Sequence, residues 1–330
     1  MRLIDREEVK KLLPMGDAIE VVARSLTVLA RGKAGNPLRS ICWLPDRRGA
    51  LGFMPASMEE PAMLGAKIVS VFPGNSSTEL DSHQGVVLLF EGKNGRLLLV
   101  ADGSEITAIR TAAASAVATR VLAREDAHEL AILGTGVQAA SHVEAMLAVR
   151  PITEVRVFGV SPERTRAFAL RQSERHGVKA TACGSAREAV EEAAIVCTTT
   201  SSHEPVLKGV WLAEGTHINA VGACFPSARE LDTDAVVRSR LFVDLRESAR
   251  HEAGDFIIPR DEGAITDDHI QGELGELLLG KVEGRRSSDE ITLFKSLGIG
   301  TYDLACAAHL YQRAREEGLG VEIELGGMRR

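Results

Sequence analysis

The second half of the chain alternates between short apolar runs and longer amphipathic stretches. The apolar runs have the length and β-branched content of buried strands, and they read "ELAILG", "EVRVFGV", "AAIVCTTT", "HINAVG" and "LFVDL". The stretch "SPERTRAFALRQSERHG" lies between two of these runs and has helical composition. Such alternation is typical of a parallel sheet with helices on both faces. We therefore predict a Rossmann-type, doubly wound α/β domain over residues 113–301.

The first half of the chain begins with helical patterns. Asp5 can cap a first short helix. A second helix is predicted from apolar residues that recur at helical spacing, namely Ile19, Val22, Leu26 and Leu29. The Ala-rich stretch over residues 104–123 predicts a long helix, with Ser104 near its cap.

Between these helices the pattern changes to short apolar runs separated by Pro, Gly and Asn, over residues 39–100. This spacing predicts a mostly antiparallel sheet. We therefore predict a smaller α+β domain over residues 1–112, and we expect the last helical pattern, in residues 302–330, to return to it.

Composition limits the functional classes. A length of 330 residues suits two domains, and a net charge of −7 without a basic tract argues against nucleic acid or a membrane surface as a partner. The five cysteines form no C-x-x-C pair, which favours a reducing compartment over disulfides or a zinc site, so we predict no metal. The N-terminus resembles no signal peptide, and no apolar run approaches the length of a membrane helix. We expect a cytoplasmic protein.

The stretch "AILGTGVQA" carries a G-x-G-x-x-A pattern between a predicted strand and a predicted helix. Gly134 permits the tight turn, Gly136 lets the backbone approach a pyrophosphate, and Ala139 allows close packing. A structural turn is the alternative, but the βαβ context favours dinucleotide binding. Further predicted cofactor contacts come from the same turn and from the ends of two later strands, namely Val137, Gln138, Thr200, Ala220 and Val221.

The end of the next strand bears on which dinucleotide binds. An acid there would bind the ribose 2′-hydroxyl of NAD, but this chain has Gly159, followed by Ser161 and Arg164. A serine and an arginine suit a 2′-phosphate, so NADP(H) is favoured while NAD(H) stays possible. The alternative is that Arg164 and Arg166 only form a solvated helix face.

Several stretches together resemble the ornithine cyclodeaminase/mu-crystallin family, closest to its mu-crystallin-like ketimine reductase branch. They occur in order along nearly the whole chain: "GAKIVSVFPGN", "DSHQGVVLLFEGKNGRLLLVADGSEITAIRTAAASAVATRVLA", "AILGTGVQA", "INAVGACFPSARELD", "ELGELLLG" and "TLFKSLGIGTYDLACA". The resemblance implies a Rossmann domain joined to a substrate-binding and dimerisation domain. It also implies NAD(P) chemistry on the C–N bond of an amino acid or a cyclic imino acid, in a homodimer.

By motif position the resemblance implies roles for individual residues. Arg39 looks like the arginine that holds the substrate carboxylate, and Lys67 like the active-site lysine. The remaining assignments are Arg110, Ser82 and His83 at the cofactor and Glu273 and Cys224 in the substrate pocket. From the residues alone, Arg39 could equally be a surface charge, and Lys67 could extend from a strand toward solvent.

One departure from the family's sequence pattern limits which of the family's reactions this chain is expected to catalyse. Cyclodeaminases and the alanine dehydrogenase branch carry a catalytic aspartate after "NA.G", whereas this chain has Cys224 there and the mu-crystallin branch also lacks the acid. A neutral thiol is a poor base and a poor partner for a developing cation. Reduction of a preformed imine needs no such base.

The sequence therefore predicts an NAD(P)H-dependent ketimine reductase. Its substrate would be Δ1-pyrroline-2-carboxylate or Δ1-piperideine-2-carboxylate, giving proline or pipecolate. An amino-acid dehydrogenase or an ornithine or lysine cyclodeaminase is the second interpretation, and a non-enzymatic, crystallin-like binder of the cofactor is the third.

Overall fold

The computed structural model describes residues 1–325, apart from the side chains of Ser76 and Ser77, and the chain divides into two compact units. Unit 1 comprises Met1–Arg110 and the chain from Ile299 onward, and unit 2 comprises Thr111–Gly298. No helix among residues 1–325 is both long and apolar enough to cross a membrane.

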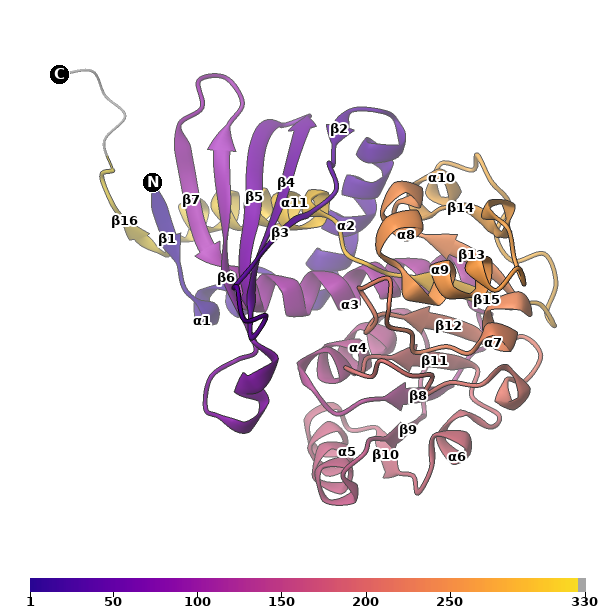
Figure 1. Ribbon diagram of the computed structural model, residues 1–330. Coiled ribbons are helices and arrows are strands. Elements are labelled where there is room, and N and C mark those ends of the chain that lie inside the picture. The colour runs from indigo at the N-terminus through magenta and orange to yellow at the C-terminus, as the bar shows by residue number, and fades with distance from the viewer. Residues whose placement is uncertain (326–330) are drawn as a thin grey trace. The chain divides into compact units, whose positions relative to one another are not determined.

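Unit 1 is built on an eight-stranded mixed sheet (Figure 1). The strand order is β16-β1-β7-β6-β5-β4-β2, and β3 also pairs with β4. The pairs from β2 to β7 are antiparallel, as predicted, whereas β1 runs parallel to β7. The strands are β1 (Arg2–Ile4), β2 (Ala34–Gly35), β3 (Ser40–Trp43), β4 (Ala50–Glu59), β5 (Ala62–Val71), β6 (His83–Glu91), β7 (Leu97–Asp102) and β16 (Val321–Glu322).

Two helices cover one face of this sheet. Helix α11 (Gly300–Glu317) lies across β4, β5 and β6, and α2 (Met15–Ala30) packs beside it (Figure 1). The apolar stripe that predicted α2 is largely buried there, including Ile19, Val22 and Leu26. The short helix α1 (Arg6–Leu12) and the 3-10 turn η1 (Pro73–Ser77) complete the unit. Asp5 caps α1 in a reciprocal capping box with Glu8, so this prediction is confirmed.

Unit 2 is an eight-stranded, entirely parallel sheet of order β10-β9-β8-β11-β12-β15-β13-β14. The predicted α/β fold class is confirmed. Its strands are β8 (Glu129–Leu133), β9 (Glu154–Phe158), β10 (Lys179–Ala182), β11 (Ile195–Thr198), β12 (His217–Ala220), β13 (Ser239–Val243), β14 (Ile270–Glu273) and β15 (Ile291–Lys295). Its helices are α4 (Val137–Val149), α5 (Pro162–His176), α6 (Ala186–Val190), α7 (Thr233–Val237), α8 (Arg246–Glu252), α9 (Gly254–Asp261) and α10 (Leu274–Leu278), with 3-10 turns η2 (Gly209–Trp211) and η3 (Asp267–His269).

The long helix α3 (Gly103–Leu122) begins in unit 1 and ends in unit 2. At its cap, Asp102 Oδ1 accepts a hydrogen bond from Glu105 N at 2.7 Å, and Ser104 instead donates to the His83 carbonyl. Ser104 thus lies near the cap, as predicted, but the capping side chain is that of Asp102, two residues earlier. Asp102 also ends β7, and a carboxylate at that junction binds the free N–H groups of the first helical turn.

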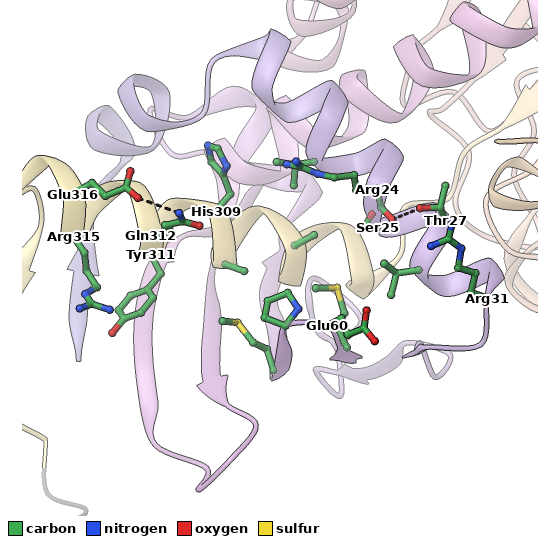
Figure 2. Close-up of a pocket in the computed structure, with 17 residues that line it drawn as sticks. Arg24, Ser25, Thr27, Arg31, Glu60, His309, Tyr311, Gln312, Arg315 and Glu316 are labelled. Carbon is green, nitrogen blue, oxygen red and sulfur yellow. Dashed lines mark hydrogen bonds between the residues drawn. The ribbon is translucent and has the colours of Figure 1, made fainter. Parts of the chain in front are cut away.

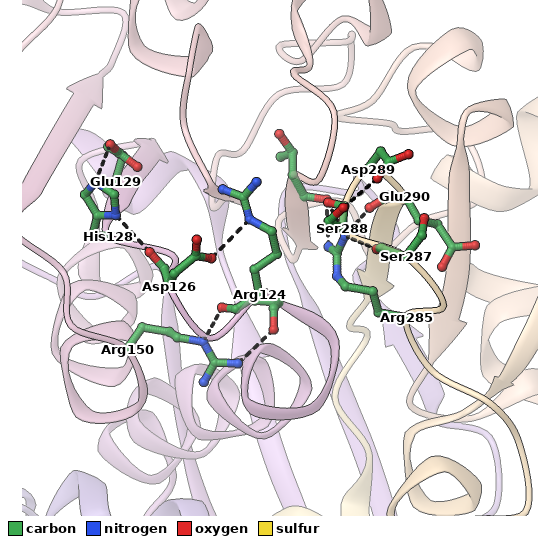
Figure 3. Close-up of polar contacts among 12 residues, drawn as sticks. Arg124, Asp126, His128, Glu129, Arg150, Arg285, Ser287, Ser288, Asp289 and Glu290 are labelled. Carbon is green, nitrogen blue, oxygen red and sulfur yellow. Dashed lines mark hydrogen bonds and ion pairs between the residues drawn. The ribbon is translucent and has the colours of Figure 1, made fainter.

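Two arginines of unit 2 hold the C-terminal end of α3 (Figure 3). Arg150 donates to the carbonyl groups of Thr119, Ala123 and Arg124 at 2.8–2.9 Å, and Arg285 donates to that of Leu122 at 2.6 Å. Carbonyl groups at and just beyond a helix C-terminus lack a full set of helical N–H donors, so the two guanidinium groups supply donors there and interact favourably with the negative end of the helix dipole. The helix end is therefore a fixed part of unit 2.

Candidate active site

The turn between β8 and α4 fits a pyrophosphate. Gly134 has a φ of +125°, and a Cβ there would lie 2.7 Å from Thr199 Oγ1, so the position requires glycine. Gly136 is the N-cap of α4, no side chain accepts from the first-turn N–H groups, and a Cβ on Gly136 would meet no atom within 4 Å. Val137 and Gln138 begin this first turn, and Ala139 is fully buried behind it. Open N–H groups at the positive end of a helix bind phosphate well.

The topology of unit 2 places other predicted residues on the same edge of the sheet. β8 and β11 are neighbours, and the chain continues from β8 to β9 and β10 on one side and from β11 to β12 on the other. Ligands of such sheets bind at the carboxyl ends of strands where the order reverses. Thr200 follows β11, Ala220 ends β12 and Val221 follows it. The parallel sheet thus brings these three residues to the edge that carries the glycine turn.

The end of β9 carries the three residues predicted to choose the dinucleotide. Ser161 is the N-cap of α5, and its Oγ accepts from Arg164 N at 3.3 Å, whereas the Arg164 side chain is exposed. A Cβ on Gly159 would lie 2.8 Å from Thr135 Cγ2 and 3.1 Å from Thr165 Oγ1. An acid at position 159 would therefore disturb the glycine turn itself, which is a structural reason for glycine independent of the cofactor.

Glu230 connects the loops that follow β11 and β12, and the sequence analysis assigned it no role. Its Oε1 accepts from Thr200 N and Oγ1 at 2.7 Å each, and its Oε2 accepts from Gly222 N at 2.6 Å and Thr198 Oγ1 at 2.7 Å. The side chain is fully buried. A carboxylate with four donors in a low-dielectric interior is a strong anchor, because each bond is charge-assisted. It fixes the backbone around Thr200 and Val221.

A second carboxylate and a lysine complete this group, which we call the Glu230 cluster: Glu230, Asp255 and Lys295. Asp255 Oδ1 accepts from the N–H groups of Glu230 and Leu231 at 2.8 and 3.0 Å, and its Oδ2 lies 2.9 Å from Lys295 Nζ. Burial lowers the pKa of Lys295, but Asp255, Cys224 and Glu230 together raise it further than burial lowers it. The pKa of Glu230 is raised, chiefly by burial and then by Asp255.

In unit 1 a different ionic group surrounds Lys67, and we call it the Lys67 cluster: Lys67, Arg110 and Asp303. Lys67 lies in β5 opposite Met54 and Val87. Its Nζ is 3.2 Å from Asp303 Oδ2 and donates to Thr107 Oγ1 at 3.2 Å, and Arg110 Nε donates to Asp303 Oδ1 at 3.0 Å. The three charged side chains are 1–4% exposed.

The Lys67 cluster lowers the pKa of Lys67 to about 7, from an ordinary 10.5. Burial is the main cause and the Arg110 guanidinium the next, while Asp303 opposes both and Arg39 adds a smaller lowering effect. A lysine with such a pKa can both donate and accept a proton near neutral pH. This is the most strongly activated acid–base group that the predicted residues provide.

The remaining predicted residues of unit 1 lie around this cluster. Arg39 is half-buried just before β3, and its charge acts on Lys67. His83 begins β6, its Nδ1 lies 3.0 Å from Ser82 Oγ, and partial desolvation and the Lys67 ammonium lower the pKa of its imidazole. Unit 1 therefore brings together Arg39, Lys67, His83 and Arg110. Their assignment to substrate or cofactor stays a prediction.

Two further predicted residues, Glu273 and Cys224, have structural partners in unit 2. Glu273 Oε1 accepts from Arg246 N at 2.9 Å, and burial is the main reason why its pKa is raised. Cys224 is half-buried, and its Sγ lies 3.6 Å from the Val221 carbonyl oxygen. Cys224 thus belongs to the loop that Glu230 anchors. The role of Glu273 in a substrate pocket stays a prediction.

A cavity of about 930 Å³ in unit 1 lies apart from these groups (Figure 2). Its lining comes from α2, α11 and the β4–β5 hairpin and contains none of the predicted residues. Arg24, Arg31 and Arg315 are exposed around it, and Arg315 stacks 5.6 Å from the ring centre of Tyr311. The size of this cavity therefore does not identify the place where the predicted reaction would occur. Among residues 1–325, no group of three or more His, Cys, Asp or Glu side chains could hold a metal ion.

The sequence analysis missed four buried charged residues, namely Asp303, Glu230, Asp255 and Lys295. Asp303 lies in "TYDLACA" and Glu230 in "RELD", two stretches that carry the family resemblance, so their acids were visible signals. Lys295 also lies in a quoted stretch, "TLFKSLG", whereas Asp255 lies in none of them. The pairing of Asp255 with Lys295 joins positions 40 residues apart in the chain through the fold of unit 2.

Similarity to known proteins extends over both units. The sequence profile of the ornithine cyclodeaminase/mu-crystallin family matches residues 2–318. A Delta(1)-pyrroline-2-carboxylate reductase of Bacillus cereus is 37% identical over 325 residues, which cover 98% of this chain and 100% of that protein. The structure of Thermococcus litoralis Delta(1)-pyrroline-2-carboxylate reductase in complex with NADH and L-proline has a TM-score of 0.96 and 41% identity, covering 98% and 100% of the two chains. An archaeal alanine dehydrogenase dimer with bound NAD has a TM-score of 0.93 and 32% identity, covering 99% of each chain.

Proposed function

The chain belongs to the ornithine cyclodeaminase/mu-crystallin family, and on that premise we propose that it is a ketimine reductase that converts Δ1-pyrroline-2-carboxylate to proline with NAD(P)H. Two similar proteins, from Bacillus cereus and Thermococcus litoralis, are named for this reaction, and the second was solved with NADH and L-proline. These relatives favour the five-membered ring over Δ1-piperideine-2-carboxylate, which would give pipecolate.

The observation that carries the proposal is the Lys67 cluster. It holds a buried ammonium whose pKa is about 7 beside a second cation, Arg110, and a single carboxylate, Asp303. Such a site attracts an anionic substrate and can supply a proton to it at neutral pH. Both properties are what an imine with a carboxylate group requires.

The proposed roles follow from this chemistry. The Arg39 guanidinium binds the substrate carboxylate through two parallel hydrogen bonds, which fix the plane of the ring. The Lys67 ammonium donates a proton to the imine nitrogen and regains one from water after product release. When bound, a reduced nicotinamide supplies the hydride that the imine carbon accepts. The C=N double bond becomes CH–NH, so one hydride and one proton account for the product.

The geometry around Cys224 favours a reductase over a cyclodeaminase. Loss of ammonia from ornithine needs a base, and the family's aspartate is replaced here by a thiol whose neighbours are Val221 and the Glu230 cluster. Glu230, which follows on the same segment, accepts four hydrogen bonds and holds the loop. Asp232 accepts from Gly209 N and Ala235 N, so both carboxylates of this segment have structural partners.

The choice of dinucleotide is a finer part of the proposal. Two structural relatives were solved with NADH or NAD, so the family site accepts the unphosphorylated cofactor. We nevertheless propose a preference for NADPH, because Gly159 stands where an acid would select NAD, and the exposed Arg164 follows within the first turn of α5.

Arg164→Ala tests this preference better than Gly159→Asp, which would strain the turn around Thr135. We expect the variant to lose roughly tenfold in kcat/KM for NADPH and to change little for NADH, since one arginine–phosphate contact of this kind is equivalent to about 1.4 kcal/mol. Arg166→Ala, at a second exposed arginine of α5, is the matched control. If Arg164→Ala and Arg166→Ala lowered kcat/KM for NADPH equally, Arg164 would not be the contact that selects NADPH. The same holds if Arg164→Ala lowered kcat/KM equally for NADPH and NADH.

A homodimer is also part of the proposal. The face of the unit 1 sheet opposite α11 carries large exposed apolar side chains, including Leu51, Phe53, Leu64 and Val86, which are 36–49% exposed. A second copy would remove this apolar area from water, and a structural relative is an alanine dehydrogenase dimer. Light scattering should give twice the mass of one chain, and Phe53→Glu should shift the protein toward the monomer.

The cytoplasmic location stays a proposal that rests on the five cysteines, all free in the described chain. Fractionation of the source cells would test it.

The decisive assay mixes the purified protein with Δ1-pyrroline-2-carboxylate and NADPH. We expect imine-dependent oxidation of the cofactor and one proline formed per cofactor consumed. Ammonia release from ornithine would indicate a cyclodeaminase, and activity only with pyruvate and ammonia an alanine dehydrogenase. Cofactor binding without any of these reactions would favour a binding protein.

A further inference from the structure

We propose that Asp303, through its contacts with Lys67 and Arg110, is a positioning residue that keeps the Lys67 ammonium charged and in place for proton transfer to the imine. This inference rests on the proposed function, because it explains how the proton donor of that reaction is maintained. In this role Asp303 contacts Lys67 and Arg110, and it acts on the reaction through Lys67 rather than by touching substrate or cofactor.

Asp303 is the one anion among the described charged groups that act on Lys67. The others are Arg110 on α3, Arg39 before β3 and His83 at the start of β6. Both oxygens of Asp303 lie within 3.4 Å of Lys67 Nζ, and Oδ1 also accepts from Arg110 Nε at 3.0 Å. The carboxylate therefore separates and holds two like charges that would otherwise repel each other.

The carboxylate is itself held firmly in the fold. Asp303 lies in the first turn of α11, where the positive end of the helix dipole favours an anion. The start of α11 is fixed, because Thr301 N and Oγ1 both donate to Asn36 Oδ1 at 3.0 Å. A Cβ on Gly300 would lie 2.7 Å from the Pro55 carbonyl oxygen, so the helix begins in close contact with β4. Asp303 is thus positioned by backbone packing rather than by its ionic partners alone.

The balance of charges explains why this one residue matters. Burial and Arg110 already lower the pKa of Lys67 to about 7 against the opposing effect of Asp303. Without the carboxylate, its raising effect is lost while burial and the two guanidinium groups still lower the pKa, so most of the lysine would be neutral at pH 7. A neutral amine cannot donate the proton that the proposed reaction needs. In that case the rate of imine reduction would decline at lower pH than in the wild type, since only the protonated lysine is active.

The test measures the titration of Lys67 without turnover. In protein labelled with ¹³C-lysine, the ¹³Cε resonance of Lys67 is identified by its loss in Lys67→Met and followed with pH. We expect its midpoint near pH 7 in the wild type and about one to three pH units lower in Asp303→Asn. Asp303→Glu keeps the negative charge, so the Lys67 midpoint in this variant should lie close to that of the wild type. Asp17→Asn is the matched control, because Asp17 is a carboxylate of the same unit whose partner on α11 is His309.

A variant of the opposite kind keeps the proposal testable if Asp303→Asn does not fold. Arg110→Gln removes a cation and leaves Asp303 in place, so the Lys67 midpoint should rise above that of the wild type. The pH at which kcat for imine reduction declines should move in the same direction as the midpoint in each variant. An unchanged or raised midpoint in folded Asp303→Asn, or an unchanged or lowered midpoint in Arg110→Gln, would overturn the inference.

The two readouts separate this inference from the proposed function. Midpoints that move as expected in a protein that does not reduce the imine would support the role of Asp303 in charging Lys67 and refute the proposed reaction. Midpoints that do not move in a protein that reduces the imine would refute the role of Asp303 and leave the reaction standing.

Discussion

Lys67 in unit 1 and Lys295 in unit 2 are both buried, and each is paired with one aspartate, yet their pKa values move in opposite directions. Burial is the largest single effect at both lysines and lowers the pKa in each case. In the Lys67 cluster a second cation, Arg110, adds to that effect, and the pKa falls to about 7. In the Glu230 cluster Cys224 and then Glu230 add to the raising effect of Asp255, and the pKa is raised.

The difference shows that the count of charges in a buried cluster decides what its lysine can do. Two cations around one carboxylate leave a lysine that releases a proton easily near neutral pH. Two carboxylates around one cation keep the lysine charged throughout the neutral range, where it serves only as a counter-ion. The first arrangement suits proton transfer, and the second suits a permanent support for loops, here those that contain Thr200 and Val221.

The largest effect is expected when the proton donor is removed. Lys67→Met should lower kcat for imine reduction by about 10² to 10⁴-fold, the range typical of a lost general acid. The protein should stay folded, because Arg110 still pairs with Asp303, and NADPH binding should be nearly unchanged. Steady-state kinetics and a cofactor titration would measure both. A kcat within threefold of the wild type would show that Lys67 is structural.

The same substitution in the other cluster should act on stability. Lys295→Met leaves Asp255 and Glu230 without a counter-ion, and we expect a loss of about 3 to 5 kcal/mol in the free energy of unfolding. Urea denaturation would measure it.

Lys67→Met is the matched control for stability, and its sign follows from proton linkage. Because the folded pKa of about 7 lies below the ordinary 10.5, the unfolded chain binds more protons between these values. Lys67 therefore destabilises the fold at pH 7, and this effect fades as pH rises through that range, so Lys67→Met should be neutral or stabilising at pH 7. Equal destabilisation by both substitutions would refute the comparison.

A smaller effect is expected from the anchor of the cofactor loops. In Glu230→Gln, the new amide group would face the N–H of Gly222 and the hydroxyl of Thr198, two donors. We expect the Kd for NADPH to rise roughly tenfold, which is equivalent to about 1.4 kcal/mol. NADPH fluorescence titration would show it, with Glu188→Gln as the control, since that carboxylate binds another loop of unit 2 at Gly184. An unchanged Kd for NADPH would indicate that Glu230 contributes to folding but not to cofactor binding.

The smallest effect is expected at Cys224. The thiol lies beside the Glu230 cluster, whose lysine exchanges no proton near neutral pH, and imine reduction needs no base there. Cys224→Ser should keep kcat/KM within about threefold, because the substitution is nearly isosteric. A loss of a hundredfold in a folded variant would assign the thiol a role in the chemistry.

Local features of the sequence predicted much of the fold. Alternating apolar runs predicted the parallel sheet of unit 2, and Asp5 with Glu8 formed the expected cap of α1. At the start of α3 the sequence placed Ser104 near the cap, but the capping side chain is Asp102, because the helix begins directly at the end of β7. Strand periodicity and caps depend on residues a few positions apart, so they can be recognised without knowledge of tertiary contacts.

What the sequence by itself determined is the turn at Gly134 and Gly136, the fold class, and, through the family resemblance, the candidate residues Arg39 and Lys67. What only the tertiary structure decided is which charges meet. Asp303 contacts Lys67, which is 236 positions away in the chain, and Arg110, which is 193 positions away, because α11 packs on the sheet of unit 1. The proton affinity of a buried lysine depends on the sum of nearby charges and on burial, and neither quantity is encoded in the residues adjacent to it in the chain.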